Sequence, residues 1–169
     1  MERKISRIIS MNVDLTDQKH ALNRVESLAE QNKGAYVCVS NVHMCIETMR
    51  CDDFQSIVNN ADFVIPDGKP LSWAQNLLGH TSAAQVRGQD IMNAICAASG
   101  EQSINIGLYG GSSAELLAVV NNILLASYPG INITYTFSPP FRPLTEAEDT
   151  EVVAAINQAK VNVLFVGIG

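Results

Sequence analysis

The strongest constraint on the fold is an alternation, along the whole chain, of short apolar runs with amphipathic stretches. The apolar runs are rich in β-branched and aromatic residues and are bounded by turn residues, which is the pattern of buried β-strands. The predicted strands are 35–39, 63–65, 104–109, 131–135 and 161–166, with a further strand near 5–11.

The stretches between these runs carry apolar residues at helical spacing and have capping residues at their ends. Pro70 suits the first turn of one helix, and Thr145 is followed at capping-box spacing by a glutamate. One predicted helix begins at Thr16 or Asp17 and ends before Gly34, a second begins at Asp52 and Asp53, and a third runs from Pro70 to Gly79. Three more are predicted over 90–98, 113–127 and 145–159. Strands that alternate with helices predict an α/β fold, in which a parallel sheet is covered by helices on both faces.

The length of 169 residues fits one domain, 1–169. Residues 163–169 end where a strand passes into a glycine turn, at which another helix would ordinarily begin. We therefore expect a sheet that is truncated at its C-terminal end, and its open edge favours self-association into a homo-oligomer or binding of a partner.

Composition excludes several classes of protein. The chain has 17 acidic and 11 basic residues, a net charge of −6, which argues against a general nucleic-acid binder. No apolar run approaches the ~20 residues that a membrane span needs, and no hydrophobic region follows the first basic residues as in a signal peptide. The cysteines form no CxxC pair and have apolar neighbours, so we expect reduced, buried thiols in a cytosolic protein; they are Cys38, Cys45, Cys51 and Cys96. The three histidines are scattered, so a metal cluster gains no support.

Candidate site residues follow the predicted strands, because ligands of open α/β sheets bind at the carboxyl ends of the strands. Asp67 follows a buried strand, and its carboxylate could accept a proton from a hydroxyl nucleophile while Gly68 leaves room for a substrate. The alternative is a Pro-Asp-Gly turn with a solvated carboxylate. Ser40 and Asn41 end another strand, where an asparagine orients a sugar hydroxyl or makes an ordinary turn.

Two further motifs suit a phosphate. Gly110 and Gly111 lie between a strand and a helix, where backbone N–H groups and the helix dipole could hold a phosphate, or where a tight turn caps the helix. They match neither a dinucleotide fingerprint nor a P-loop. Arg87 offers a planar fork for a diphosphate beside Gly88, and the alternative is a surface arginine. The chain has no Asp-x-Asp pair of the kind that holds a divalent cation in many sugar-nucleotide transferases.

Together these motifs form an ordered series, in which Asp67-Gly68 is followed by Arg87-Gly88-x-Asp90. The full series is 61–70, Gly79, 86–90, 108–111, 128–130 and 163–169, with Asn41 ahead of it. In order and spacing it resembles the WecG/TagA/CpsF family of bacterial glycosyltransferases. The resemblance implies a Rossmann-like α/β fold, with 1–169 as a single glycosyltransferase domain that forms the N-terminal catalytic core and lacks the family's C-terminal appendage.

The resemblance also implies an activity. A sugar, of the N-acetylmannosamine type or a related hexose, would pass from a UDP-sugar to a saccharide linked to polyprenyl diphosphate, with inversion and with neither a metal ion nor a cofactor. This family builds teichoic acid, common antigen and exopolysaccharide at the cytoplasmic face of the membrane. Asp67 matches the catalytic base, and Asn41 and Arg87 match pocket residues. We add Ser40, Gly68, Gly110 and Gly111 as expected substrate contacts.

The sequence departs from the family pattern at two places. Val39 stands where a threonine is common, with Ser40 next to it, and the segment that follows the family's Gly-x-Gly is not present. A non-catalytic nucleotide-binding α/β module remains the alternative reading of the same glycine turns. A nicotinamide-dependent dehydrogenase is disfavoured by the glycine pattern.

Overall fold

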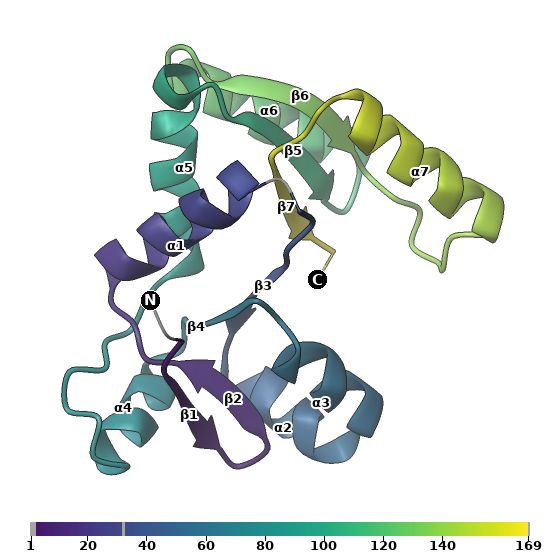
Figure 1. Cartoon of the computed structure of the whole chain (residues 1–169). Helices are drawn as coiled ribbons and strands as arrows, with labels where there is room; N and C mark the ends of the chain where they lie inside the picture. Colours follow the sequence, from purple (N-terminus) through teal and green to yellow (C-terminus); the bar gives the residue numbers. More distant parts are fainter. Residues whose placement is uncertain (1–2, 32, 169) are drawn as a thin grey trace. The chain divides into compact units, whose positions relative to one another are not determined.

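The structure is a computed structural model that describes residues 3–31 and 33–168. The chain divides into two compact units, Met1–Ile91 and Met92–Gly169, and each is described by itself (Figure 1). The division falls within the helix α5 (Gly88–Gln102). The assignment of 1–169 to one domain stays a prediction.

The first unit contains an antiparallel hairpin and a parallel pair of strands. The hairpin joins β1 (Ile5–Ile8) to β2 (Met11–Asp14), and the parallel pair is β3 (Val37–Ser40) with β4 (Phe63–Pro66). The strand predicted near 5–11 is confirmed over 5–8 only, because the chain reverses at Ile9, which has a φ of 57°, and 11–14 forms a second strand. A β-branched residue rarely adopts that conformation. The turn also lacks the Gly or Asn that usually signals a hairpin, so the sequence pattern did not reveal it.

Four helices of the first unit are described: α1 (Gln18–Gln31), α2 (Val42–Arg50), α3 (Asp52–Asn59) and α4 (Lys69–Leu77). The predictions for α1, α3 and α4 are confirmed, including the proline in the first turn of α4. Helix α2 was not predicted. Its cap Asn41 was read instead as a strand-end residue, because α2 starts directly after β3 with no intervening loop.

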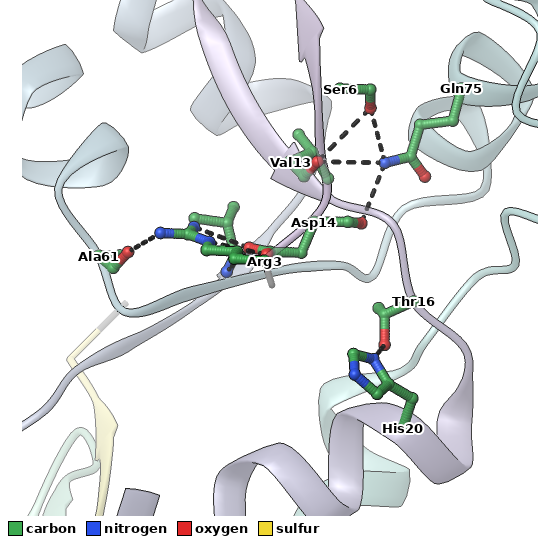
Figure 2. A network of polar contacts seen from close by, with 9 residues as sticks. Arg3, Ser6, Val13, Asp14, Thr16, His20, Ala61 and Gln75 are labelled. Carbon is green, nitrogen blue, oxygen red and sulfur yellow. Dashed lines mark hydrogen bonds and ion pairs between the residues drawn. The ribbon is translucent and has the colours of Figure 1, made fainter. Parts of the chain in front are cut away.

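The hairpin is held to β4 by a buried carboxylate (Figure 2). Asp14 is only 2% exposed, and its oxygens accept from Nε and Nη2 of Arg3 at 2.7 and 2.8 Å and from the Val64 N–H at 2.7 Å. Arg3 also donates to the Ala61 carbonyl at 2.7 Å, and its hydrogen bond to Asp14 raises the pKa of Arg3. The bonds from Arg3 to Ala61 and from Val64 to Asp14 cross between the hairpin and the start of β4, so they set the position of that strand.

The apolar core of the first unit shares Ala61 and Val64 with these contacts. Its buried members come from the hairpin, α2, α3, the turn before β4, β4 itself and α4, and are Ile8, Met11, Val13, Cys45, Val58, Ala61, Val64 and Leu71. Helix α4 contacts β1 and β4, so its buried side is fixed against the strand whose carboxyl end carries Asp67 (Figure 1).

The second unit is a parallel sheet of three strands in the order β6–β5–β7. Its strands are β5 (Asn105–Gly110), β6 (Asn132–Phe137) and β7 (Val163–Gly167), and its helices after α5 are α6 (Ala114–Ser127) and α7 (Glu146–Gln158). The capping box predicted at Thr145 is observed, with Glu148, and Ser113 caps α6 at the predicted start of that helix. The predicted α/β class, with helices packed on parallel strands, is confirmed.

The cysteines are all free thiols, as predicted. Cys45 and Cys96 are buried and Cys38 is half-buried, but Cys51 is exposed, so the expectation that all four lie in the interior was wrong for Cys51. Cys51 lies at the junction of α2 and α3, where it caps both helices through its backbone and needs no buried side chain. Among the described helices, none is both long enough and apolar enough to cross a membrane.

Candidate active site at the carboxyl ends of β3 and β4

The carboxyl ends of β3 and β4 are joined by the backbone. Ser40 pairs with Pro66 in the parallel register, and beyond this pair the Ser40 carbonyl accepts from the N–H groups of Asp67 and Gly68 at 2.9 and 3.3 Å. The two N–H groups that follow β4 are therefore folded over the end of β3. This arrangement places Asp67 beside the first residues after Ser40.

Asn41 is the first of those residues, and it caps α2. Its Oδ1 accepts from the Met44 N–H at 3.1 Å, so the carbonyl of the side chain is used while the amide nitrogen makes no hydrogen bond with the described residues. A Cβ at Gly68 would lie 3.5 Å from Cα of Asn41. Asn41 and Gly68, the caps of α2 and α4, are thus in contact, and two helix amino termini begin at one sheet edge. Such termini favour negative charge.

Gly68 has a φ of −75°, which any residue adopts. Its backbone conformation therefore does not require glycine, and an added Cβ would lie at an ordinary van der Waals distance from Asn41. The approach of a substrate to the backbone at Gly68 stays a prediction.

A third segment, 85–88, is attached to the same edge. The Val86 N–H donates to the Pro66 carbonyl at 3.0 Å, and the side-chain amide of Gln85 donates to the carbonyl of Asp67. Gly88 packs so closely on Val39 that a Cβ would come within 2.7 Å of Val39 Cγ1. Arg87 lies between these anchors, exposed, and its guanidinium makes no hydrogen bond or ion pair with the residues that the structure describes.

Two more side chains at this edge are polar and unpaired within the described ranges. Ser40 is fully buried, and its hydroxyl lacks a hydrogen-bond partner. An unsatisfied buried hydroxyl costs about 1–3 kcal/mol, which a ligand or water that reached it would relieve. Asp67 is half-exposed, and its carboxylate makes no hydrogen bond or ion pair with any described residue. Its backbone is fixed on both sides, so the carboxylate is positioned but still free to accept a proton.

Gly110 and Gly111 lie in the second unit, at the carboxyl end of β5. Gly110 has a φ of 138°, and a Cβ there would lie 2.1 Å from the Gly167 carbonyl oxygen, so only glycine fits. The N–H of Gly111 donates to that same carbonyl at 3.1 Å. In this geometry the Gly111 N–H is already used, which favours the tight-turn reading for that residue. The phosphate contact of both glycines stays a prediction.

The comparisons with known proteins address the whole chain. A model of the glycosyl transferase WecG/TagA/CpsF family matches residues 6–169. The chain belongs to this family. An N-acetylglucosaminyldiphosphoundecaprenol N-acetyl-beta-D-mannosaminyltransferase of Bacillus spizizenii is 22% identical to it over 140 residues, which are 83% of this chain and 52% of that relative. The chain thus spans about half the length of the curated relative that it matches.

Within this WecG/TagA/CpsF chain the structure brings together Ser40, Asn41, Asp67, Gly68 and Arg87, the five site residues predicted in the first unit. Sequence reasoning missed Gln85, which bonds the Asp67 backbone across 18 positions of chain. A glutamine two residues before the Arg-Gly pair was the available signal, but a side-chain amide in a polar loop is usually solvated. Its partner is visible only in the tertiary structure.

Histidines of this chain do not assemble a metal centre among the described residues, where no group of three His, Cys, Asp or Glu side chains is gathered. His20, for example, bonds Thr16 through Nδ1 at 2.9 Å (Figure 2) and packs edge-on against Phe63, so it has a structural role in the first unit. Whether the reaction uses a metal ion is a separate question, and metal independence stays a prediction.

Proposed function

We propose that the chain transfers a sugar of the N-acetylmannosamine type from a UDP-sugar to a saccharide carried on polyprenyl diphosphate, with inversion and without a metal ion. The reaction takes place at the cytoplasmic face of the membrane, in the synthesis of a cell-surface polysaccharide such as teichoic acid or an exopolysaccharide. Family membership and the name of the mannosaminyltransferase relative support this class of reaction.

The observation that carries the proposal is the attachment of Asp67, Asn41 and Arg87 to one sheet edge through backbone hydrogen bonds and close packing. Asp67 accepts the proton of the acceptor hydroxyl as that oxygen attacks the anomeric carbon of the donor. The bond from the anomeric carbon to the diphosphate breaks on the opposite face, and its electron pair leaves with UDP. General-base assistance of this kind is worth about 10²–10⁴-fold in rate.

The departing diphosphate needs positive charge. Arg87 supplies a guanidinium that no described carboxylate neutralises, and the amino termini of α2 and α4 add their dipoles at the same edge. The free amide nitrogen of Asn41 can donate to a sugar hydroxyl, since only its Oδ1 is used in capping. Ser40 has an unpaired, buried hydroxyl at the same strand end.

The test is Asp67→Asn in the full chain. UDP release is measured with a soluble short-chain diphosphate-linked N-acetylglucosamine acceptor and UDP-N-acetylmannosamine. We expect transfer to fall by at least about 10²-fold, while UDP affinity and the melting temperature stay near those of the parent chain. Asp53→Asn, an exposed carboxylate of α3, is the matched control. Full activity of Asp67→Asn would show that Asp67 is not the catalytic base. A parent chain that binds UDP without transferring sugar would favour the non-catalytic nucleotide-binding module.

A further inference from the structure

Helix α4 of the first unit carries large apolar side chains on its solvent side. Trp73 is 65% exposed and Leu77 is 90% exposed, whereas Leu71 and Gln75 on the other side of the helix are buried. The solvent side of a surface helix ordinarily carries polar residues, and exposed large apolar side chains that cluster mark an interaction surface. We therefore expect the exposed side of α4 to bind a partner.

The arrangement of this side is regular. Lys69, Trp73 and Leu77 are spaced at i, i+4 and i+8, which places them in one row along the helix, and Lys69 is exposed as well. We call these three residues the α4 row. Leu78, the C-cap, extends its apolar end and is 56% exposed.

The charged side chains of α4 and of the loop that follows it are basic. Residues 68–89 contain Lys69 and Arg87 but no aspartate or glutamate, in a chain whose net charge is −6. A tryptophan and leucines beside a lysine combine apolar insertion with attraction to anions, and the nearest carboxylate in sequence is that of Asp67, which the proposed function places in the active site. This composition is typical of segments that lie in the headgroup region of an anionic bilayer.

We propose that the α4 row docks this protein on the surface of an anionic lipid bilayer. The Trp73 ring lies at the headgroup level, Leu77 enters the acyl boundary, and Lys69 faces lipid phosphates. The inference rests on the proposed function in one respect. Because α4 begins directly after Gly68, docking through the row holds Asp67 beside a bilayer that contains the lipid-linked acceptor. Leu77 is about 12 Å along the helix axis from Lys69, at a rise of about 1.5 Å per residue.

The chain supplies its own probe, because Trp73 is its only tryptophan. The full chain is mixed with phosphatidylcholine vesicles that contain or lack phosphatidylglycerol, and Trp73 emission is recorded without nucleotide or acceptor. We expect a blue shift with the anionic vesicles, and quenching by lipids with brominated acyl chains. Leu77→Gln should lower the partition coefficient about tenfold. Lys69→Gln should lower it about fivefold, on the anionic vesicles alone.

Ile57→Gln is the matched control, since Ile57 of α3 is 58% exposed in the same unit and belongs to no such row. It should leave the partition coefficient unchanged. The proposal is overturned if Trp73 emission does not shift with anionic vesicles, or if Ile57→Gln weakens binding as much as Leu77→Gln. A blue shift that needs no lipid and follows protein concentration, with a dimer in sedimentation, would assign the row to a second copy and overturn it too.

These outcomes are independent of the transfer reaction. Vesicle binding is measured without substrates, and transfer is measured with a soluble acceptor that needs no bilayer. A chain that transfers sugar while Trp73 stays in water refutes the docking surface alone. A chain that docks through the row without transferring sugar refutes the proposed function and leaves the surface in place.

Discussion

The amide N–H of Asp67 donates to the carbonyl of Ser40 over 2.9 Å, so the acid that follows β4 is attached to the end of β3. The carbonyl of Asp67 is held in turn by the side chain of Gln85. With the backbone held on both sides, the position of the carboxylate depends on its own side-chain torsions alone. A base restricted in this way loses little entropy when it meets a hydroxyl.

Replacement of Arg87 tests the anion site. Arg87→Ala removes an exposed guanidinium that makes no ion pair with the described residues, so the fold should be unaffected while UDP binds about tenfold more weakly. Isothermal calorimetry measures the affinity. Arg50→Ala is the control, because Arg50 is also exposed and, among the described residues, its ion pair is with Glu47, one turn away. Equal affinities for the parent chain and Arg87→Ala would take Arg87 out of the site.

Replacement of Asp14 tests the attachment of the hairpin. Asp14→Ala leaves the Val64 N–H and the Arg3 guanidinium without their acceptor, and the lost charged hydrogen bonds are worth about 2–3 kcal/mol in the free energy of unfolding. Urea denaturation measures the loss. Asp53→Ala, an exposed carboxylate, should cost much less. A difference below about 0.5 kcal/mol between the two variants would contradict the role of the buried carboxylate.

Replacement of Gly110 tests the close approach of β5 to β7 in the second unit. Gly110→Ala places a Cβ 2.1 Å from the Gly167 carbonyl oxygen at a positive φ, so β5 and β7 must separate. We expect a loss of about 3 kcal/mol or more in the free energy of unfolding. Gly34→Ala is the control, since Gly34 also has a positive φ but nothing lies within 4 Å of its added Cβ. It should lose only about 1 kcal/mol, and equal losses would refute the close approach.

Glu148 provides a test of pH dependence. Hydrogen bonds from Arg142 and Thr145 lower the pKa of the Glu148 carboxyl from 4.5 to about 2. Because the folded pKa lies below the unfolded one, the stabilisation is complete above about pH 4.5 and is lost as the pH falls toward 2. An NMR titration should give a midpoint near 2, which Arg142→Ala should raise toward 4.5. An ordinary midpoint in the parent chain would show that the pair does not form in solution.

Local patterns in the sequence were enough to place most elements. The strands β3 to β7 follow from β-branched runs, and the ends of α4, α6 and α7 follow from Pro70, Ser113 and Thr145, because caps and periodicity depend on residues within a turn of one another. The hairpin was missed because Ile9 turns without a glycine or asparagine. The α2 helix was missed because Asn41 ends a strand and caps a helix at the same time.

The sequence by itself determined which residue types follow each strand, and so it identified Asp67, Asn41 and Arg87 as candidates. Only the tertiary structure decided which of them share one edge, that Gln85 holds Asp67, and that the Gly111 N–H is bonded to Gly167. The physical reason is that these contacts depend on the pairing of β3 with β4 and of β5 with β7. Parallel register joins residues far apart in the chain, and no short-range pattern encodes it.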